Sequence, residues 1–305
     1  MNPHYTDYAE LLGRLFPGQK VQKLSVDAGH GCPNRDGTIG RGGCIYCNNE
    51  TFSPGYVRMV ASVAEQLERG KEFFARKYPQ QKYLAYFQSY TSTHCGLEQA
   101  VGQWREALSV PGVVGLVVGT RPDCMPDALL AELARINASG TPVIVEFGAE
   151  TMHDRTLRLI NRGHSAAQTL DAVQRTSAAG LSVSLHLIMG LPGESEEEML
   201  QTVRQVCALP VDSLKFHQLQ VVKGTPLHTE YLRQQTGQAS DMPAIRPFGV
   251  KEYINLCVKI IDLVPRRIAI ERFTASAPAS LLVAPAWGLK NYQFTNLLRN
   301  ALTGR

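Results

Sequence analysis

Residues 29–49 read GHGCPNRDGTIGRGGCIYCNN, a glycine-rich loop that directly follows a strand-like run at 21–28. Eleven residues separate Cys32 from Cys44, and two separate Cys44 from Cys47. Thiolates are soft ligands, so a Cys-x-x-Cys pair on a flexible loop can place two sulfurs on an iron–sulfur cluster or on zinc. The stretch therefore predicts a metal site.

Three cysteines are one ligand short of a saturated metal site. A structural zinc takes four protein ligands, and His30 or Cys95 would have to complete it. A four-iron cluster held by three thiolates instead leaves one iron open to a small-molecule ligand. The loop alone is compatible with both.

Outward from the loop, strands and helices alternate, which is the pattern of a parallel sheet with crossover helices. Apolar, β-branched or aromatic runs predict strands at 23–28, 83–89, 113–118, 142–147, 182–189 and 213–221. Six consecutive βα units with right-handed crossovers predict an α/β fold, a partial (β/α)6 TIM-type barrel. We expect a lead-in at 1–20, the barrel at 21–227 and a small C-terminal α/β extension at 228–305.

Capping signals and apolar faces locate the helices. Helices are expected at 8–16, 62–76 and 248–263, and a short strand at 267–271. Pro126 opens one of the crossover helices, Ser165 caps another, and Ser195 with Glu198 forms a capping box.

In such barrels the chemistry lies on loops at the carboxyl ends of the strands. Polar or glycine-rich segments follow every predicted strand. After the cysteine loop come FQSYTST at 87–93, GTRPD at 119–123, EFGAE at 146–150 with NRGH at 161–164, HLIMGLPGE at 186–194, and KGTPL at 223–227. Their positions support the barrel and predict a site at one end of it.

With Tyr46 between Cys44 and Cys47, the loop resembles the Cys-x-x-x-Cys-x-aromatic-Cys motif of radical S-adenosylmethionine (SAM) proteins, apart from its longer first gap. A widened gap is also a feature of the Elongator catalytic subunit and of the YhcC/YtqA-type proteins, which this sequence resembles along nearly its whole length. The resemblance implies a [4Fe–4S] cluster on Cys32, Cys44 and Cys47. It also implies SAM at the open iron, an external one-electron donor, and reductive cleavage of SAM to a 5′-deoxyadenosyl radical.

The same resemblance implies how SAM is held. Arg162 belongs to the Asn-Arg-Gly-His run shared with the Elongator and coproporphyrinogen oxidase groups, and its guanidinium suits the SAM carboxylate. The segment after the second strand stands where a Gly-Gly-Glu-like segment usually holds the amino group. Gly119 replaces a common glutamate and His186 a common aspartate. The expected SAM-binding residues are Tyr46, Gln88, Tyr90, Thr91, Thr120, Glu150, Arg162, His186 and Ile188.

For substrate, the resemblance implies the wobble uridine of tRNA, with remodelling of a 5-carboxymethylaminomethyl side chain towards 5-aminomethyl. From residue 264 onward, the sequence contains six Lys or Arg residues and one acidic residue. The basic residues are interleaved with Phe273, Trp287, Tyr292 and Phe294. Basic and aromatic side chains together suit RNA. Two alternatives stay open: radical modification of a small molecule or tetrapyrrole, and a zinc-structural RNA-binding protein.

The charge, hydropathy and cysteine spacing of the sequence indicate where in the cell the protein is located. The formal net charge of +4 is mild, no run of about 18 apolar residues occurs, and the N-terminus lacks a signal-peptide core. The seven cysteines are not spaced as a disulfide framework. We expect a cytoplasmic protein that does not interact with membranes.

Overall fold

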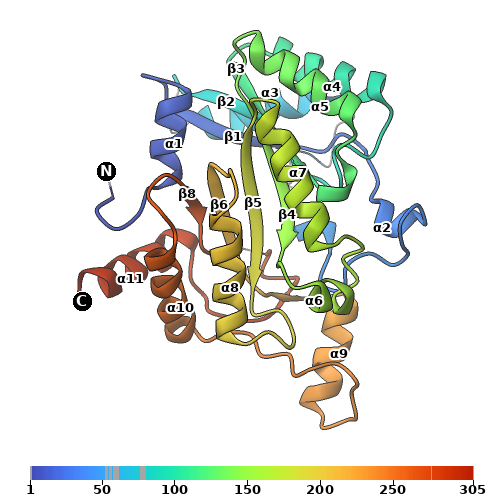
Figure 1. Ribbon diagram of the computed structural model, residues 1–305, viewed down its shortest axis with the longest axis vertical. Helices are drawn as coiled ribbons and strands as arrows, with labels where there is room; N and C mark the ends of the chain where they lie inside the picture. The colour runs from blue at the N-terminus through green and yellow to red at the C-terminus, as the bar shows by residue number, and fades with distance from the viewer. Residues whose placement is uncertain are drawn as a thin grey trace.

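The computed structural model describes residues 2–51, 54, 57, 62–75, 80–275 and 277–304, and its central element is a sheet of seven parallel strands (Figure 1). The strands follow the order β1-β2-β3-β4-β5-β6-β8. They are β1 (Val21–Val26), β2 (Lys82–Phe87), β3 (Val113–Thr120), β4 (Val143–Glu150), β5 (Ser182–Met189), β6 (Ser213–Gln218) and β8 (Ala269–Arg272). The sheet curls into an open half-barrel, which confirms the predicted partial TIM-type α/β fold.

Helices cover the outer face of the sheet, with α7 and α8 lying across it in Figure 1. The helices are α1 (Tyr8–Leu15), α2 (Pro33–Asp36), α3 (Val63–Ala75), α4 (Leu97–Ser109), α5 (Asp127–Ala138), α6 (Asp154–Leu159), α7 (Ala166–Ala178), α8 (Glu196–Cys207), α9 (Pro226–Gln235), α10 (Val250–Leu263) and α11 (Asn291–Thr303). The predicted caps at Ser165 and Ser195 are confirmed, because both hydroxyls accept from the backbone three residues on. The predicted end of the 62–76 helix lies outside the described residues.

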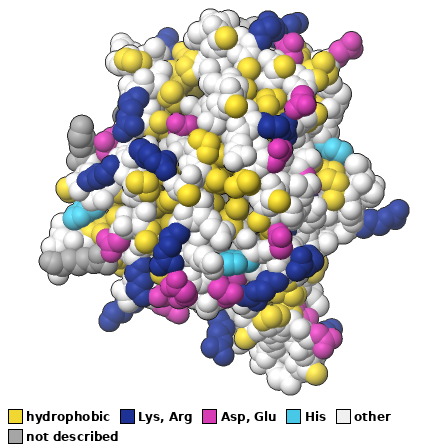
Figure 2. All heavy atoms as spheres, viewed as in Figure 1, with side chains coloured by type: hydrophobic (Ala, Val, Ile, Leu, Met, Phe, Trp, Pro, Cys, Tyr) yellow, Lys and Arg dark blue, Asp and Glu magenta, His cyan; other side chains and the backbone are white. Residues whose placement is uncertain are grey.

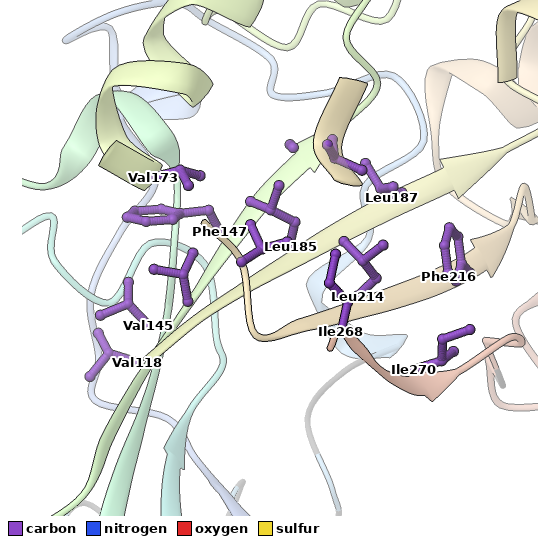
Figure 3. Packing of buried hydrophobic residues seen from close by; sticks show 14 of the residues in the cluster. Val118, Val145, Phe147, Val173, Leu185, Leu187, Leu214, Phe216, Ile268 and Ile270 are labelled. Atoms are coloured by element: carbon purple, nitrogen blue, oxygen red, sulfur yellow. The ribbon is translucent and has the colours of Figure 1, made fainter. Parts of the chain in front are cut away.

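The main core lies between this outer face and the helices. Figure 3 shows its centre, where Val145, Phe147 and Leu185 from adjacent strands pack with Val173 of α7. Each of these four side chains is fully buried. Burial of one such side chain contributes about 1.5–3 kcal/mol, so this layer fixes the strands that carry the site.

An apolar cluster occupies the amino-terminal end of the inner face. There Phe16 and the partly buried Tyr8 and Leu12 pack against Leu84 and Ile144 of the inner sheet face. The backbone of Asp7 also pairs with Ile270 of β8. The lead-in therefore fills the amino-terminal end of the half-barrel and leaves the carboxyl-terminal end for polar residues.

Two strands differ from the prediction. The run at 213–221 breaks after Gln218, and Val221–Val222 forms a separate strand, β7, antiparallel to β9 (Leu282–Ala284). The short strand predicted at 267–271 is β8, which extends the main sheet by pairing parallel to β6. The proposed division at residue 228 remains a prediction.

Among the described residues, no helix combines the length and the apolar character that crossing a membrane requires.

Candidate active site

A cavity of about 320 Å³ lies at the carboxyl ends of the strands, within the size range of small-molecule sites (about 300–1,000 Å³). All twelve residues predicted to bind the cluster or SAM line it: Cys32, Cys44, Cys47, Tyr46, Gln88, Tyr90, Thr91, Thr120, Glu150, Arg162, His186 and Ile188. The structure thus brings them together from five strand ends, and their individual roles remain predictions.

The long gap between the first two cysteines folds into a compact unit. Cys32 precedes the short helix α2, and the chain turns back through a backbone bridge between Asp36 and Arg41. The amide of Cys47 then donates to the carbonyl of Cys44 at 3.0 Å, and Arg35 donates to the carbonyl of Cys47 at 2.8 Å. The additional residues therefore do not separate the cysteines, which all reach the same cavity.

The Asn-Arg-Gly-His run, which follows β4 and α6, holds the cysteine loop by hydrogen bonds. The side-chain amide of Asn161 donates to the carbonyls of Gly43 (2.7 Å) and Arg41 (3.2 Å). Asn161 itself has a positive φ of 51°, and so does Gly163 at 81°, where a Cβ would come within 3.1 Å of the Asn34 side chain. The run is therefore a scaffold for the cysteines as well as a carrier of Arg162.

Arg162 connects the cysteine loop with β4. Its Nη1 lies 3.6 Å from the sulfur of Cys44, and its Nη2 donates to the carbonyl of Gly148 at 2.7 Å and lies 3.4 Å from Oε1 of Glu150. Burial alone would lower the pKa of this guanidinium, but the neighbouring Cys44, Tyr46 and Glu150 outweigh burial and raise it. Arg162 is therefore a permanent buried cation in the cavity wall.

Glu150 reaches this site through a distortion of β4. Its φ is +65°, and the register with β5 shifts between Gly148 and Glu150. A Cβ on Gly148 would lie 2.7 Å from Nη2 of Arg162 and 2.8 Å from Oε1 of Glu150. Burial raises the pKa of Glu150, and Arg162 and a hydrogen bond from Tyr46 oppose that shift. Positive φ at a non-glycine residue is costly and is typical of functional sites.

The donor set fits an iron–sulfur cluster better than one zinc ion. Neither His30 nor Cys95, one of which a zinc site would need, lines the cavity. Within the described residues, no group of three or more His, Cys, Asp or Glu side chains is arranged to hold a single metal ion. Burial raises the pKa of Cys47 to about 11, with a further increase from Cys44 and a decrease from Arg35. The thiolate form of Cys47 thus requires a cationic partner.

The cavity also has unsatisfied polar atoms that fit a polar ligand. Some buried atoms have no hydrogen-bond partner among the described residues, including Thr91 Oγ1, Arg121 Nη1, Glu150 Oε2, Arg162 Nε and His186 Nε2. Buried polar groups are nearly always hydrogen-bonded in native proteins. Donors and acceptors left open around one cavity therefore fit SAM, which carries amino, carboxylate and hydroxyl groups.

The remaining predicted residues have partners within the protein. The backbone N–H of Tyr90 donates to the Asn49 side chain at 3.2 Å, and Oε1 of Gln88 accepts from Ser25 at 3.0 Å. The hydroxyl of Thr120 lies 2.5 Å from that of Thr93. Ile188 contributes an apolar wall. At Gly119, a Cβ would lie 3.0 Å from the carbonyl of Phe87. The position where a glutamate is common is therefore one where β2 and β3 pack closely in this protein.

Sequence reasoning missed the charged floor of the cavity. Nζ of Lys215 lies 2.6 Å from Glu146 and 2.9 Å from the hydroxyl of Tyr86, which itself donates to Glu146. Lys23 of β1 contacts Glu146 at 3.2 Å and Glu271 at 2.6 Å. The sequence signal that could have revealed these residues is a charged side chain inside an otherwise apolar strand, because Lys and Glu are rarely buried without a partner.

His217, which lies beside the predicted residue His186, was missed as well. The rings of His186 and His217 lie 4.0 Å apart in an edge-on arrangement, and Arg272 donates from Nε to Nε2 of His217 at 2.9 Å. Burial lowers the pKa of both imidazoles well below the usual value, and neighbouring cations lower it further. Both rings are therefore neutral at physiological pH.

Comparison with known proteins places these features in a family context. The family model of the Radical SAM superfamily matches residues 28–206, and that of the Radical_SAM C-terminal domain matches residues 211–303. Protein YhcC of Escherichia coli is 40% identical over 88% of this chain and 83% of its own length. YtqA of Bacillus subtilis is 32% identical over 94% of this chain and 86% of its own.

More distant similarity extends to tRNA-modifying enzymes. A tRNA uridine(34) acetyltransferase of Methanocaldococcus infernus is 27% identical over 56% of this chain and 30% of its own length. The solved structure of Elp3 from M. infernus matches with a TM-score of 0.66 at 18% identity, covering 94% of this chain and 63% of that one. This structural likeness shows the shared fold, and the chain spans less than two thirds of that structure.

Proposed function

Because this chain belongs to the radical SAM superfamily and is a radical SAM enzyme of the YhcC/YtqA type, we propose that Cys32, Cys44 and Cys47 hold a [4Fe–4S] cluster and that the adjoining cavity holds SAM. When bound, a cluster with one open iron supplies the electron that cleaves SAM into methionine and a 5′-deoxyadenosyl radical. The observation that carries the proposal is the convergence of all twelve predicted residues on one cavity with unsatisfied polar atoms.

The protein's own side chains bind and orient SAM. Arg162 donates to its carboxylate through the guanidinium that already lies beside Cys44. Glu150, with one open carboxylate oxygen, accepts from its amino group. The wall at Ile188 and the lead-in at the far end exclude water, which protects a radical from side reactions.

The electron comes from an external reductant that approaches the cysteine loop. Cys32 and Cys47 are partly exposed, whereas Cys44 is buried. The exposed side of the loop is therefore the side where a donor protein reaches the cluster, and the opposite side faces SAM.

For the substrate, we propose the wobble uridine of tRNA, with remodelling of its 5-carboxymethylaminomethyl side chain towards 5-aminomethyl. The similarity to a tRNA uridine(34) acetyltransferase supports this choice. The C-terminal tail contributes less than its composition predicted, since Phe273 and Phe294 are buried in the core and cannot stack on bases. Tyr292 remains 62% exposed. On the face shown in Figure 2, basic and acidic side chains are interspersed.

Two cysteine variants test the cluster assignment. Cys44→Ala is expected to lose the visible iron–sulfur absorbance after anaerobic reconstitution and to abolish 5′-deoxyadenosine formation. Cys207, buried on α8 away from the cavity, serves as the matched control. Cys207→Ala should retain both signals; equal losses in the two variants would show that the cluster ligands are misassigned.

Nucleoside mass spectrometry of tRNA from a deletion strain tests the substrate. Loss of the protein is expected to change the wobble-uridine profile, with 5-carboxymethylaminomethyluridine accumulating. An unchanged profile would exclude the tRNA assignment and return attention to small-molecule or tetrapyrrole substrates.

A further inference from the structure

Arg272 lines the cavity and forms no ion pair with a carboxylate of the described residues. The other buried cations of the cavity and its floor are paired: Arg121 with Asp123 (2.8 Å), Arg162 with Glu150 (3.4 Å), Lys215 with Glu146 (2.6 Å) and Lys23 with Glu271 (2.6 Å). Arg35 belongs to the cysteine loop and donates to Cys47. Arg272, the last residue of β8, also lines the cavity, and within the described residues it forms no ion pair with Asp or Glu.

His217 orients Arg272 without neutralising it. Both Nε and Nη2 of Arg272 donate to Nε2 of His217, the former at 2.9 Å. The imidazole nitrogen that accepts these bonds carries no proton, and burial keeps the ring neutral. His186 packs against the other side of His217 at a ring distance of 4.0 Å. One edge of the guanidinium is thus fixed, and in the described part of the chain no hydrogen bond occupies Nη1.

This arrangement is costly unless an anion completes it. Arg272 is paired in register with Lys215, so two cations occupy neighbouring inner positions of β6 and β8. A partly buried charge needs a partner, and a guanidinium offers a planar carboxylate two parallel hydrogen bonds. Arg162 follows β4, whereas Arg272 lies on β8, separated from β4 by β5 and β6. The anion that would bind Arg272 is therefore distinct from the SAM carboxylate.

We propose that Arg272, oriented by His217, binds a carboxylate of the molecule on which the enzyme acts. The inference rests on the proposed function and specifies its substrate class: a wobble uridine whose side chain carries a carboxylate beyond its amine. An RNA phosphodiester offers a guanidinium the same single charge, so the test separates these two sources. Arg272 is then the residue that distinguishes the carboxylate-bearing uridine from neutral analogues.

Two anticodon stem-loops provide the test. One carries 5-carboxymethylaminomethyluridine at the wobble position, and the other carries the methyl ester of the same side chain, which keeps the amine but removes the negative charge. Their binding to reconstituted protein with SAM is measured by fluorescence anisotropy. Charge-assisted hydrogen bonds predict about 10- to 100-fold tighter binding of the carboxylate form by the unmodified protein.

Arg272→Gln is expected to bring that ratio close to one, and Arg272→Lys should restore part of it. Arg299→Gln is the matched control, because Arg299 is an exposed arginine on α11 outside the cavity; it should keep the full ratio. Iron content and thermal unfolding of each variant verify that the fold is intact. If Arg272→Gln misfolds, the ratio for Arg272→Lys decides the question, and a value equal to that of the unmodified protein would overturn the proposal.

The remaining outcomes separate the inference from the proposed function. If Arg272→Gln weakens both stem-loops equally, Arg272 contacts the RNA backbone and the carboxylate assignment is wrong. If the unmodified protein binds both stem-loops with the same affinity, the tRNA function stands and the inference about Arg272 falls. If it binds neither, the proposed substrate is wrong and the inference fails with it.

Discussion

The smallest feature on which the site depends is the absent side chain of Gly148. Arg162 and Glu150 approach each other directly over this residue, and the guanidinium donates to its carbonyl at 2.7 Å. Glu150 adopts its left-handed conformation just beyond it. Any side chain at this position would push apart the two groups assigned to the carboxylate and amino ends of SAM.

Gly148→Ala is therefore expected to reduce SAM cleavage at least about 10-fold, since misplaced positioning groups cost rate steeply. The added Cβ would lie 2.7 Å from Nη2 of Arg162, a contact that real Cβ atoms do not make. The measurement is 5′-deoxyadenosine formation by reconstituted protein, together with thermal unfolding.

Gly102→Ala is the matched control, because Gly102 lies inside α4 and a Cβ added there would have no neighbour within 4 Å. This substitution should leave SAM cleavage unchanged and stabilise the fold by about 0.4–1 kcal/mol. Full activity of Gly148→Ala would show that Arg162 and Glu150 do not need this close approach.

At the scale of elements, the segment between α6 and α7 acts as a clamp on the cysteine loop. Asn161 combines two functions there: its φ of 51° turns the chain, and its side-chain amide holds the carbonyls of Arg41 and Gly43. The backbone carbonyl of Ile160 also accepts from the amide of Ile45 at 3.1 Å. The loop is thus positioned by side-chain and backbone contacts before any cluster binds.

Asn161→Gly and Asn161→Ala separate the two functions of this residue. Glycine keeps the positive φ at no steric cost but loses the amide, whereas alanine loses the amide and adds strain. We expect both variants to bind less iron on reconstitution. Both variants should also lose stability with the amide hydrogen bonds, and Asn161→Ala should lower the unfolding free energy by about 1 kcal/mol more than Asn161→Gly. Normal iron content in both variants, measured by metal analysis, would show that the clamp does not position the cysteines.

Elements were predictable where local chemistry determines them. The cap at Ser165, the capping box at Ser195 and the apolar strands predicted the βα alternation, and the strand-end motifs predicted where the cavity lies. The break after Gln218 was not predictable, because the apolar run continues into β7 while its partner β9 lies some 60 residues further on. The positive φ of Glu150 was also not predictable, since the neighbouring residues carry no signal for a left-handed glutamate.

Across the whole molecule, the two edge strands of the half-barrel are joined by charge. Lys23 of β1 lies 2.6 Å from Glu271 of β8 and 3.2 Å from Glu146 of β4, and its side chain is only 12% exposed. The parallel ladder runs from β1 through β6 to β8, and within the described strands none pairs β8 with β1. This ionic contact therefore closes the ring that the backbone leaves open.

Lys23→Met is expected to lower the unfolding free energy by about 3–5 kcal/mol, because the largely buried Glu271 carboxylate loses its 2.6 Å contact and keeps the longer one to Lys215 at 3.9 Å. The measurement is urea unfolding of the apoprotein followed by circular dichroism. Adding Glu271→Gln to Lys23→Met should recover part of the loss, as expected for coupled residues.

The control is Lys259→Met. Lys259 pairs with Glu196 at 2.5 Å, but both side chains are about half exposed. An exposed pair of this kind contributes no more than about 1 kcal/mol. A loss of similar size in Lys23→Met and Lys259→Met would show that the edge contact does not hold the half-barrel together.

The Lys23–Glu271 contact also determines where the wall of the half-barrel can open. Separating any other two neighbouring strands means breaking a row of amide-to-carbonyl hydrogen bonds. Within the described residues, separating β1 from β8 breaks side-chain contacts, and the lead-in adds a backbone bridge from Asp7 to β8. The boundary between β1 and β8 is thus the line along which the barrel can open, and Arg272 lies on the β8 side of it. A bulky polymer such as a folded nucleic acid would widen the mouth along this line, with the rest of the wall undisturbed.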